Sequence, residues 1–531
     1  MPGQDVVVRG FGFSDVENLI PVKPATLFPV ASLTKTLTNI ALLQLTQQGL
    51  IDPADPVAAY LPEFSVNSRF DPSPPMTIHH LQCHTSGLPR DMFKGLIAST
   101  PQPRPGLIEY LSGQYVSFVP GTKYSYSNLG YELLGMVIER VSGMSYQQFI
   151  TQNILRPLGM KNSYFLSDLP DAGIISRPYV LNDRQARVEP PIRLAASAGL
   201  YSCSADFSLL LKFLLNTHEQ QQIVSHSLVA RMFTSQKKQD AIDVSLQWGL
   251  SWLLEDLPDP FQGHFVYQIG NTLHYNSLIA LAPEYGLGLV FFSNTAGSIQ
   301  PVLNVARRVI ASSVEQLTGI KALAPEPVEQ LPVVEPDPTM VNLIRGDYLS
   351  ENMFLQIFAI HGDVVLKVGG EAFQLFANED GWFRLNPELR FRVQQMGQAK
   401  ILMMENNGFV APDAIEVNPD MPLHQDIAQR LGTYYLANVD PEQEEVFYQK
   451  LKLQLDQNDI LQVTLYLGDF HRELFGLEAS TYNLMPAGEG NMIFAGFGMY
   501  RGETLFLDQD EDGYIVSFSG LEFYRPFSSV Q

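Results

Sequence analysis

Two short segments far apart in the chain carry residues that could together perform acyl transfer. Ser32 and Lys35 lie three positions apart in Ser-Leu-Thr-Lys, and Tyr126 and Asn128 follow in Tyr-Ser-Asn. A serine hydroxyl attacks a carbonyl only when a base takes its proton, and a lysine three residues on shares its helix face. A lysine kept neutral by burial could be that base, and a tyrosine held as phenolate could serve equally. The four residues therefore suffice for nucleophilic catalysis without histidine.

The surroundings of Ser32 favour this interpretation over chance. A second Ser-x-x-Lys, Ser235 to Lys238, lies in a polar stretch that we expect at the surface. Ser32 instead opens an apolar run that ends at Gly49, which predicts a buried helix. Ser32 is expected at or near its N-terminus, where backbone N–H groups favour negative charge. The competing interpretation is that Ser32 is an ordinary helix N-cap.

Several further segments, in a fixed order along the chain, resemble one enzyme family. They are MTIHHLQCHTSGLP (Met76 to Pro89), PGTKYSYSNLGYELLGMVIERVSGMSY (Pro120 to Tyr146) and ILRPLGMKNSYF (Ile154 to Phe165). Over residues 5 to 315 the chain resembles the serine β-lactamases and penicillin-binding-protein-like hydrolases, in the branch of class C enzymes, esterases and D-peptidases. The resemblance implies that Ser32 is the nucleophile, that Lys35 and Tyr126 share the proton transfers, and that Asn128 positions substrate and lysine.

The third motif of that family, a Lys or His followed by a small residue and Gly, has only a partial match. The best match is Gln268-Ile269-Gly270, where glutamine replaces the cationic or imidazole side chain. Gln268 can donate a hydrogen bond to a substrate carboxylate but brings no charge, which favours an ester or amide substrate. The resemblance also implies an oxyanion hole formed by the N–H groups of Ser32 and Asn271. His274 is a candidate replacement for the missing cation, with a surface position as the alternative.

The resemblance and the residue patterns predict an α/β (α+β) domain of the β-lactamase type over residues 1–318. It is expected to contain an antiparallel sheet flanked by helices and a helical insert that carries Tyr126 and Asn128. The apolar run Ser277 to Phe292, interrupted by Pro283-Glu284, predicts two paired strands joined by a turn. Because the chain begins almost at the second strand of the family, the sequence leaves open a central sheet without one edge strand.

The C-terminal part of the chain has a different pattern. Residues 319–340 are rich in proline and acidic side chains, as expected of an interdomain linker. Alternating apolar and polar residues then predict two small all-β barrels or sandwiches, near 341–418 and 428–528. An internal repeat joins Ile344 to Phe358 with Arg430 to Leu455, since both segments contain Gly-x-Tyr before paired strands. The layout resembles D-aminopeptidases, which join this catalytic domain to two lipocalin-like barrels.

Composition limits the remaining classes of function. The formal net charge, 34 − 56 = −22, repels nucleic acid phosphates and anionic membranes. No stretch of about 18 uncharged apolar residues is present, which excludes a membrane-spanning helix. No secretory signal is visible, so we expect a cytoplasmic protein. Cys83 and Cys203 are expected to be small buried residues, and neither a metal nor an organic cofactor is expected.

Several other residues imitate functional sites. The cluster of His79, His80 and His84 lacks a carboxylate at ligand spacing and is expected to pack at a helix start. Ser197, in Ala-Ala-Ser-Ala-Gly, imitates a nucleophile elbow, but a polar segment precedes it in place of an apolar strand. The acidic run Asp508 to Asp512 is expected to be a solvated turn, because a late Glu for calcium is missing.

The sequence therefore predicts a serine hydrolase that acts through an acyl-enzyme on Ser32. The predicted class is a peptidase or amidase of the D-aminopeptidase or carboxypeptidase kind, or an esterase, acting on a small-molecule ester or short peptide. The sequence leaves a homo-oligomer open. Two alternatives from other classes remain: a catalytically silent β-lactamase-like scaffold or binding protein, and a ligand-binding protein whose function lies in the barrels.

Overall fold

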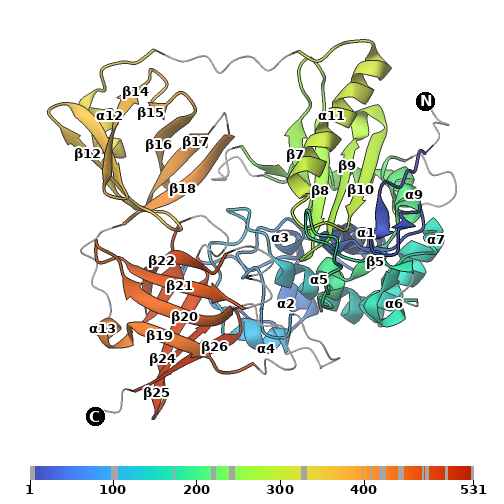
Figure 1. Cartoon of the computed structure of the whole chain (residues 1–531), viewed down its shortest axis with the longest axis horizontal. Coiled ribbons are helices and arrows are strands. Elements are labelled where there is room, and N and C mark those ends of the chain that lie inside the picture. Colours follow the sequence, from blue (N-terminus) through green and yellow to red (C-terminus); the bar gives the residue numbers. More distant parts are fainter. Residues whose placement is uncertain are drawn as a thin grey trace.

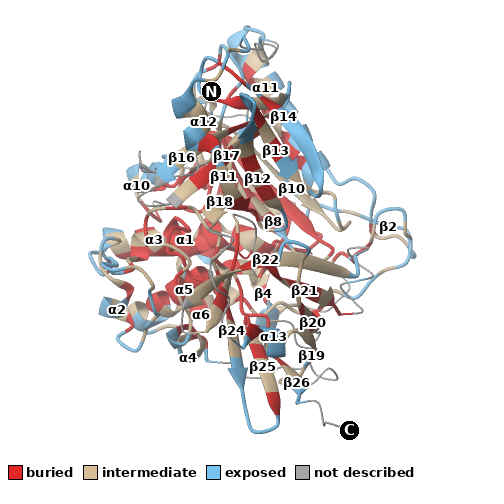
Figure 2. Cartoon of the chain, turned by 90° about the vertical axis from the view of Figure 1, so that its left-hand side faces the viewer, coloured by how far each residue is buried: buried red, intermediate tan, exposed pale blue. Residues whose placement is uncertain are grey.

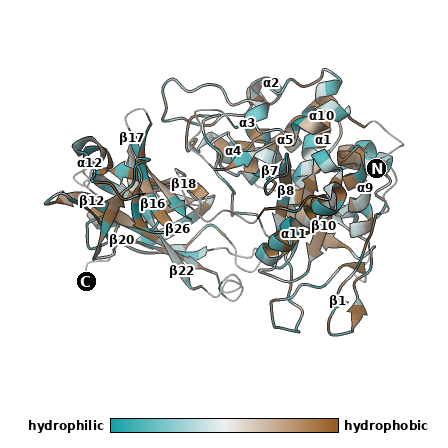
Figure 3. Cartoon of the chain, turned by 90° about the horizontal axis from the view of Figure 1, so that it is seen from above, coloured by the Kyte–Doolittle hydropathy of each residue, from teal (hydrophilic) through white to brown (hydrophobic). Residues whose placement is uncertain are grey.

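The structure is a computed structural model of the whole chain. It describes residues 6–96, 106–170, 174–216, 223–237, 245–323, 332–396, 399–406, 409–417, 426–439, 448–468, 472, 477–488, 490–496, 500 and 502–527. An α/β domain lies at one end of the molecule, and two β-barrels lie side by side at the other (Figure 1). The view from above separates the same two ends (Figure 3).

The α/β domain is built on a five-stranded antiparallel sheet in the order β10-β9-β8-β7-β6. The strands are β6 (Gln247–Trp248), β7 (Leu253–Asp256), β8 (His264–Asn271), β9 (Asn276–Ala282) and β10 (Leu287–Ser293). The pairing of β9 with β10 across the turn at Pro283–Tyr285 confirms the predicted pair of strands in this apolar run. Within the described residues, β10 and β6 are the outer strands, and β1 (Phe13–Asp15) pairs with β2 (Ile20–Pro21) as a separate hairpin.

Both faces of this sheet are covered, which explains why β9 is apolar at nearly every position. Successive strand side chains point to opposite faces. Leu278 and Ala280 belong to the hydrophobic cluster under α11 (Ile299–Thr318), whereas Ile279 and Leu281 belong to the cluster that contains α1 (Thr34–Gln47). The sheet therefore forms the middle of a three-layer domain, and the burial of α1 stands out in Figure 2.

Most of the remaining helices lie on the α1 side of the sheet and form the insert. They are α2 (Val57–Tyr60), α3 (Ile78–Gln82), α4 (Leu107–Ser112), α5 (Asn128–Ser142), α6 (Tyr146–Ile150), α7 (Arg156–Leu158), α8 (Ala195–Ala198), α9 (Ser204–Leu214) and α10 (His226–Arg231). A small sheet of β3 (Phe28–Pro29), β5 (Leu200–Ser202) and β4 (Tyr164–Phe165) joins the start of α1 to the insert. None of the described helices is long and apolar enough to cross a membrane.

The predicted buried helix after Ser32 is confirmed, with one difference at its start. Residues Ala31–Leu33 form a 3₁₀ turn, and the α-helix proper begins at Thr34. The helix ends ahead of Gly49, whose backbone has φ +71°, a conformation that glycine adopts without steric cost. Ser32 therefore stands in the turn that leads into α1 and does not cap the helix with its side chain.

Two closed eight-stranded barrels follow the α/β domain, which confirms the predicted all-β architecture. Barrel 1 consists of β11 (Gly346–Leu349), β12 (Phe354–Ile360), β13 (Asp363–Val368), β14 (Glu371–Ala377), β15 (Phe383–Asn386), β16 (Leu389–Met396), β17 (Ala399–Asn406) and β18 (Phe409–Val417). Barrel 2 consists of β19 (Gly432–Leu436), β20 (Tyr448–Leu455), β21 (Leu461–Leu467), β22 (Ala479–Gly488), β23 (Asn491–Phe494), β24 (Thr504–Gln509), β25 (Gly513–Phe518) and β26 (Leu521–Pro526). The acidic run at the β24–β25 hairpin is a turn, in which Asp510 accepts the backbone N–H groups of Asp512 and Gly513.

The internal repeat has a structural counterpart in the two barrels. A short helix precedes each first strand, α12 (Pro338–Ile344) in barrel 1 and α13 (Ile427–Arg430) in barrel 2. The buried hydroxyl of Tyr348 donates to the carbonyl of Ile344 at 2.8 Å, and that of Tyr434 donates to Arg430 at 2.6 Å. Gly-x-Tyr thus marks the same helix-to-strand joint twice. Helix α12 begins inside the stretch expected to be a linker, of which residues 324–331 lie outside the described residues.

Candidate active site

Ser32 lies in a turn with unusual backbone geometry. Its neighbour Ala31 has φ +47°, a strained conformation for a residue with a side chain. Thr34 stabilises the turn, because its hydroxyl donates to the Ala31 carbonyl at 2.7 Å and accepts the Leu200 N–H at 3.1 Å. The half-buried Ser32 side chain is therefore presented from a fixed position.

Lys35 is fully buried directly behind Ser32. Its Nζ lies 3.1 Å from Ser32 Oγ, 2.8 Å from Asn128 Oδ1 and 2.9 Å from the carbonyl oxygen of Ser197. The pKa of Lys35 is lowered from 10.5 to about 7, mainly by burial and in smaller part by the Arg90 guanidinium, while the carboxylates of Asp91 and Glu132 oppose the shift. A large share of Lys35 is therefore an uncharged amine at neutral pH.

Tyr126 approaches Ser32 from the other side. Its hydroxyl donates to Ser32 Oγ at 2.6 Å, and the Lys35 ammonium nitrogen lies 4.7 Å from the centre of its ring. Burial raises the pKa of Tyr126 to about 12, so the side chain is a phenol at neutral pH. Of the two bases considered from the sequence, the lysine therefore fits the role, whereas the phenolate form of Tyr126 does not.

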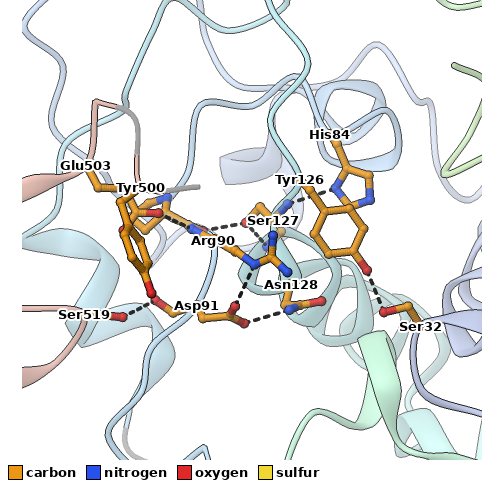
Figure 4. Close-up of polar contacts among 12 residues, drawn as sticks. Ser32, His84, Arg90, Asp91, Tyr126, Ser127, Asn128, Tyr500, Glu503 and Ser519 are labelled. Carbon is orange, nitrogen blue, oxygen red and sulfur yellow. Dashed lines mark hydrogen bonds and ion pairs between the residues drawn. The ribbon is translucent and has the colours of Figure 1, made fainter. Parts of the chain in front are cut away.

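Asn128 is the first residue of α5 and links Lys35 to a carboxylate. Its Oδ1 accepts from Lys35, while its Nδ2 donates to Asp91 Oδ1 at 2.7 Å. Because Asp91 can only accept when ionised, this bond fixes which end of the amide faces the lysine. Arg90 Nε lies 3.3 Å from the same carboxylate. Figure 4 shows the bond between Asp91 and Asn128 and, beside it, the bond between Tyr126 and Ser32.

His84 supports Tyr126 and the segment around it. Its ring centre lies 4.3 Å from that of Tyr126, and its Nδ1 accepts the Ser127 N–H at 3.1 Å. Burial, with Lys35 and Arg90 nearby, holds the pKa of His84 well below its usual value, so the imidazole is neutral.

The other two histidines of the cluster lie at a helix start. His80 and Thr77 form a capping box at the start of α3, and His79 contacts Cys83 in the same helix region, which confirms the predicted packed motif. Among the described residues, no group of three or more His, Cys, Asp or Glu side chains could hold a metal ion.

Gln268, the first residue of the third motif, makes its hydrogen bonds within the α/β domain. The Gln268 amide is buried, accepts from the Thr36 hydroxyl and donates to Ser251 Oγ at 2.9 Å. Both polar ends of this side chain are therefore bonded inside the domain, beside α1. A contact of Gln268 with a substrate carboxylate stays a prediction. Its partner on α1, Thr36, is 232 residues away in sequence, and its partner before β7, Ser251, is 17 residues away.

Gly270 allows β8 to lie directly against the Ser32 turn. A Cβ at this position would stand 2.4 Å from the Val30 carbonyl oxygen and 3.1 Å from the Ser32 nitrogen, closer than real side chains approach. Only glycine fits such a contact. The close approach brings the end of β8, where Asn271 lies, beside the Ser32 turn.

His274 is buried and not at the surface, so that alternative is wrong. Its Nδ1 lies 2.7 Å from Glu189 Oε2, and the same carboxylate accepts the N–H groups of Leu273 and His274. The histidine therefore anchors the turn between β8 and β9 to Glu189. Its role in place of the missing cation stays untested.

Sequence reasoning missed the residues that hold Lys35 from behind. The Glu132 carboxylate accepts the N–H groups of Ala196 and Ser197 and the Ser197 hydroxyl, all on one oxygen. The hydroxyl of Ser197 is thus occupied, and its carbonyl instead accepts from Lys35, so Ser197 is not a nucleophile. The only signal in the sequence was an acidic residue inside the apolar run of α5.

Two further expectations are confirmed. Ser235 of the second Ser-x-x-Lys is exposed. Cys83 and Cys203 are buried free thiols, and burial raises the pKa of both.

Comparison with known proteins agrees with this geometry. A family profile described as Beta-lactamase matches residues 2–312, more than half of the chain, so the chain belongs to the beta-lactamase family. Protein flp of Staphylococcus aureus (strain MW2) is 27% identical over 305 residues, which are 57% of this chain and 59% of flp. The similarity thus spans less than two thirds of the length of flp.

Two other relatives extend the comparison. Penicillin-binding protein 4* of Bacillus subtilis (strain 168) is 26% identical over 329 residues, covering 58% of this chain and 70% of that protein. A solved structure described as the crystal structure of SurE covers 77% of this chain and 91% of its own, with a TM-score of 0.53 and 24% identity. That likeness concerns the fold, and it extends beyond the α/β domain.

Proposed function

We propose that this chain is a serine hydrolase that forms an acyl-enzyme on Ser32. The observation that carries the proposal is the position of one oxygen atom. Ser32 Oγ lies 2.6 Å from the Tyr126 hydroxyl and 3.1 Å from Lys35 Nζ. A hydroxyl between a phenol that donates and an amine that is uncharged near neutral pH is suited to lose its proton.

The direction of proton transfer follows from the partners of Lys35. An uncharged amine has two N–H groups and one lone pair. The two carbonyl-type oxygens, Asn128 Oδ1 and the Ser197 carbonyl, can only accept, so they take the two N–H groups. The lone pair then faces Ser32 Oγ, which donates its proton to Lys35 while it accepts from Tyr126.

The reaction proceeds in two balanced steps. In acylation, Ser32 Oγ bonds to the substrate carbonyl carbon while its proton passes to Lys35, and the N–H groups of Ser32 and Asn271 stabilise the oxyanion. The bond to the leaving group then breaks as that group takes a proton through Tyr126, which is reprotonated from Lys35. In deacylation, water attacks the ester of Ser32 by the same route in reverse, which releases the acid and restores the hydroxyl.

The proposed substrates are small esters, amides and short peptides, including D-aminoacyl amides. The bonds of Gln268 to Thr36 and Ser251 support this class, because that side chain offers no charge to a substrate carboxylate. The similarity to a penicillin-binding protein supports penicillin-type acylating agents as probes. A catalytically silent scaffold remains the alternative function.

A fluorophosphonate probe tests the proposal on the intact protein. We expect wild-type protein and the Ser235→Ala variant to be labelled equally, because Ser235 is exposed at the surface. The Ser32→Ala variant is expected to remain unlabelled, and mass spectrometry of the labelled peptide should place the adduct on Ser32. Absence of Ser32-dependent labelling at high probe concentration would overturn the proposal in favour of the scaffold.

A further inference from the structure

Barrel 2 contacts a short segment of the α/β domain, residues Arg90–Phe93, which we call the docking segment. Three hydrogen bonds join them. The Arg90 N–H donates to Glu503 Oε1, the Ser519 hydroxyl donates to the Asp91 carbonyl, and the Phe93 N–H donates to the Ser519 carbonyl, each at 2.8 Å. Side chains and backbone of two barrel hairpins therefore fix the path of this segment.

The last residue of the docking segment is part of the core of barrel 2. The Phe93 ring is almost fully buried, with its centre 5.6 Å from Tyr448, 6.3 Å from Tyr500 and 6.2 Å from Phe518, all at steep edge-on angles. Edge-to-face packing of this kind adds to the stabilisation from burial. A side chain of the α/β domain thus fills an aromatic cage in the barrel.

The barrel backbone also approaches the α/β domain more closely than side chains would permit. A Cβ at Gly502 would lie 2.9 Å from the Ser117 carbonyl, and one at Gly520 would lie 2.9 Å from Met92. Both glycines have positive φ, +70° and +80°. The contact is therefore built from glycine turns that flank Glu503 and Ser519.

The docking segment leads directly to the base of the active site. Its Asp91 accepts from Asn128 Nδ2 at 2.7 Å, and its Arg90 carbonyl accepts the Asn128 N–H at 2.9 Å. Asn128 in turn accepts from Lys35. Figure 4 shows the path from Glu503 and Ser519 through Arg90 and Asp91 to Asn128.

We propose that barrel 2 is a positioning element of the active site: Glu503, Ser519 and Phe93 hold Asp91 where it orients Asn128 against Lys35. The inference rests on the proposed function. If the docking segment moves, the Asn128 amide loses the bond that fixes its orientation, and Lys35 loses one acceptor. The amine lone pair is then no longer directed at Ser32.

The chemistry of Glu503 suits this role. Burial, with Asp91 nearby, raises the pKa of Glu503 to about 8, so the group is a neutral acid at pH 7. Its carbonyl oxygen can accept the Arg90 N–H without adding a second negative charge beside Asp91. Such a charge would disturb the carboxylate that orients Asn128.

The inference is tested by acylation rates measured against pH. Fluorophosphonate labelling is followed from pH 5 to 10 for wild type, Ser519→Ala, Glu503→Ala, Glu503→Gln and Phe93→Leu in the full-length chain. We expect Ser519→Ala, Glu503→Ala and Phe93→Leu to label at least about tenfold more slowly at pH 7. The midpoints of their pH profiles should shift to higher pH, because water that reaches a less tightly held Lys35 raises its pKa toward the ordinary value. Glu503→Gln should restore the profile, since its amide oxygen can accept the Arg90 N–H.

Tyr434→Phe is the matched control, because it also removes one hydroxyl from barrel 2, but that hydroxyl bonds the Arg430 carbonyl and not the docking segment. It should leave the labelling rate and the pH profile unchanged. Cooperative unfolding first shows that Ser519→Ala, Glu503→Ala and Phe93→Leu are folded. The inference is overturned if these folded variants label with the rate and pH profile of wild type. It is also overturned if Tyr434→Phe shifts the profile equally. Failure of wild type to label on Ser32 would instead overturn the proposed function itself.

Discussion

The two barrels share one fold and one internal repeat, yet they meet the rest of the protein in different ways. Barrel 1 exchanges backbone and side-chain hydrogen bonds with the α/β domain between Val410 and the exposed Ser245. It also packs on barrel 2 through the small cluster of Leu349, Ile460 and Ala495. Barrel 2 instead holds the docking segment in buried contacts that continue to Asn128. The comparison teaches that the contacts of a barrel, and not its fold, decide its relation to the active site.

After the loss of Ser32 itself, the largest expected effect is the loss of Lys35, and it sets the scale for the barrel variants. The Lys35→Ala variant should slow acylation by about 10²–10⁴-fold, because it removes the proposed general base. Labelling kinetics on folded protein measure this loss. A variant of either barrel that exceeded it would show that the barrel does more than position the base, whereas Lys35→Ala with wild-type kinetics would contradict the proposed proton path.

The pH dependence of wild type comes next in size. Lys35 is active as a base only when uncharged, and its pKa is lowered to about 7. Protonation therefore removes the base as the pH falls, so acylation should drop by about tenfold per pH unit below 6 and reach its maximum near pH 8, where Glu503 begins to ionise. A rate profile recorded from pH 5 to 9 checks this. A rate that still rises about tenfold per pH unit between pH 8 and 9 would mean that Lys35 is not held in a desolvated site.

Matched core variants separate the barrels by function. Phe93→Ala and Phe383→Ala each remove a buried ring, the first from the cage in barrel 2 and the second from the core of barrel 1. Each should lower the free energy of unfolding by about 3–5 kcal/mol, measured by denaturant titration. Only Phe93→Ala should also slow acylation. Equal kinetic losses in both would remove the distinction between the barrels.

The smallest expected effects concern the repeated joint. Tyr348→Phe and Tyr434→Phe each delete one buried hydroxyl that bonds a helix carbonyl. Each should cost about 0.5–1.5 kcal/mol of stability and leave acylation unchanged. Thermal unfolding of the two variants beside wild type tests whether the joints are equivalent. A large difference between the two losses of stability would show that the two joints have the same geometry but contribute differently to stability.

Local patterns carried much of the prediction. Ser32 and Lys35 lie three residues apart, and helix geometry alone brings them to one face. The paired strands β9 and β10 follow from an apolar run broken by Pro283-Glu284, and the barrels follow from alternation and the repeated Gly-x-Tyr. In each case the deciding interactions lie within a few tens of residues, where sequence spacing reflects distance in space.

The parts that could not be predicted depend on long-range contacts between polar residues. Arg90 bonds Glu503 and Asp91 bonds Ser519, each more than four hundred residues later in the chain, and no local pattern marks these partners. The bonds of Gln268 to Thr36, 232 residues earlier, and to Ser251, 17 residues earlier, are marked by no local pattern either, whereas the family motif indicated a substrate contact. The domain limits, a cytoplasmic location and a homo-oligomer stay predictions.

The burial of Phe93 in barrel 2 has a consequence for the redesign of this protein. A chain cut after α11 would leave an aromatic side chain bare on the surface and remove the cage that shelters it. A chimera that receives barrel 2 of a relative should therefore also receive that relative's stretch in place of Arg90 to Leu96. The stretch from Arg90 to Leu96 and barrel 2 thus form one packing unit, although they are far apart in sequence.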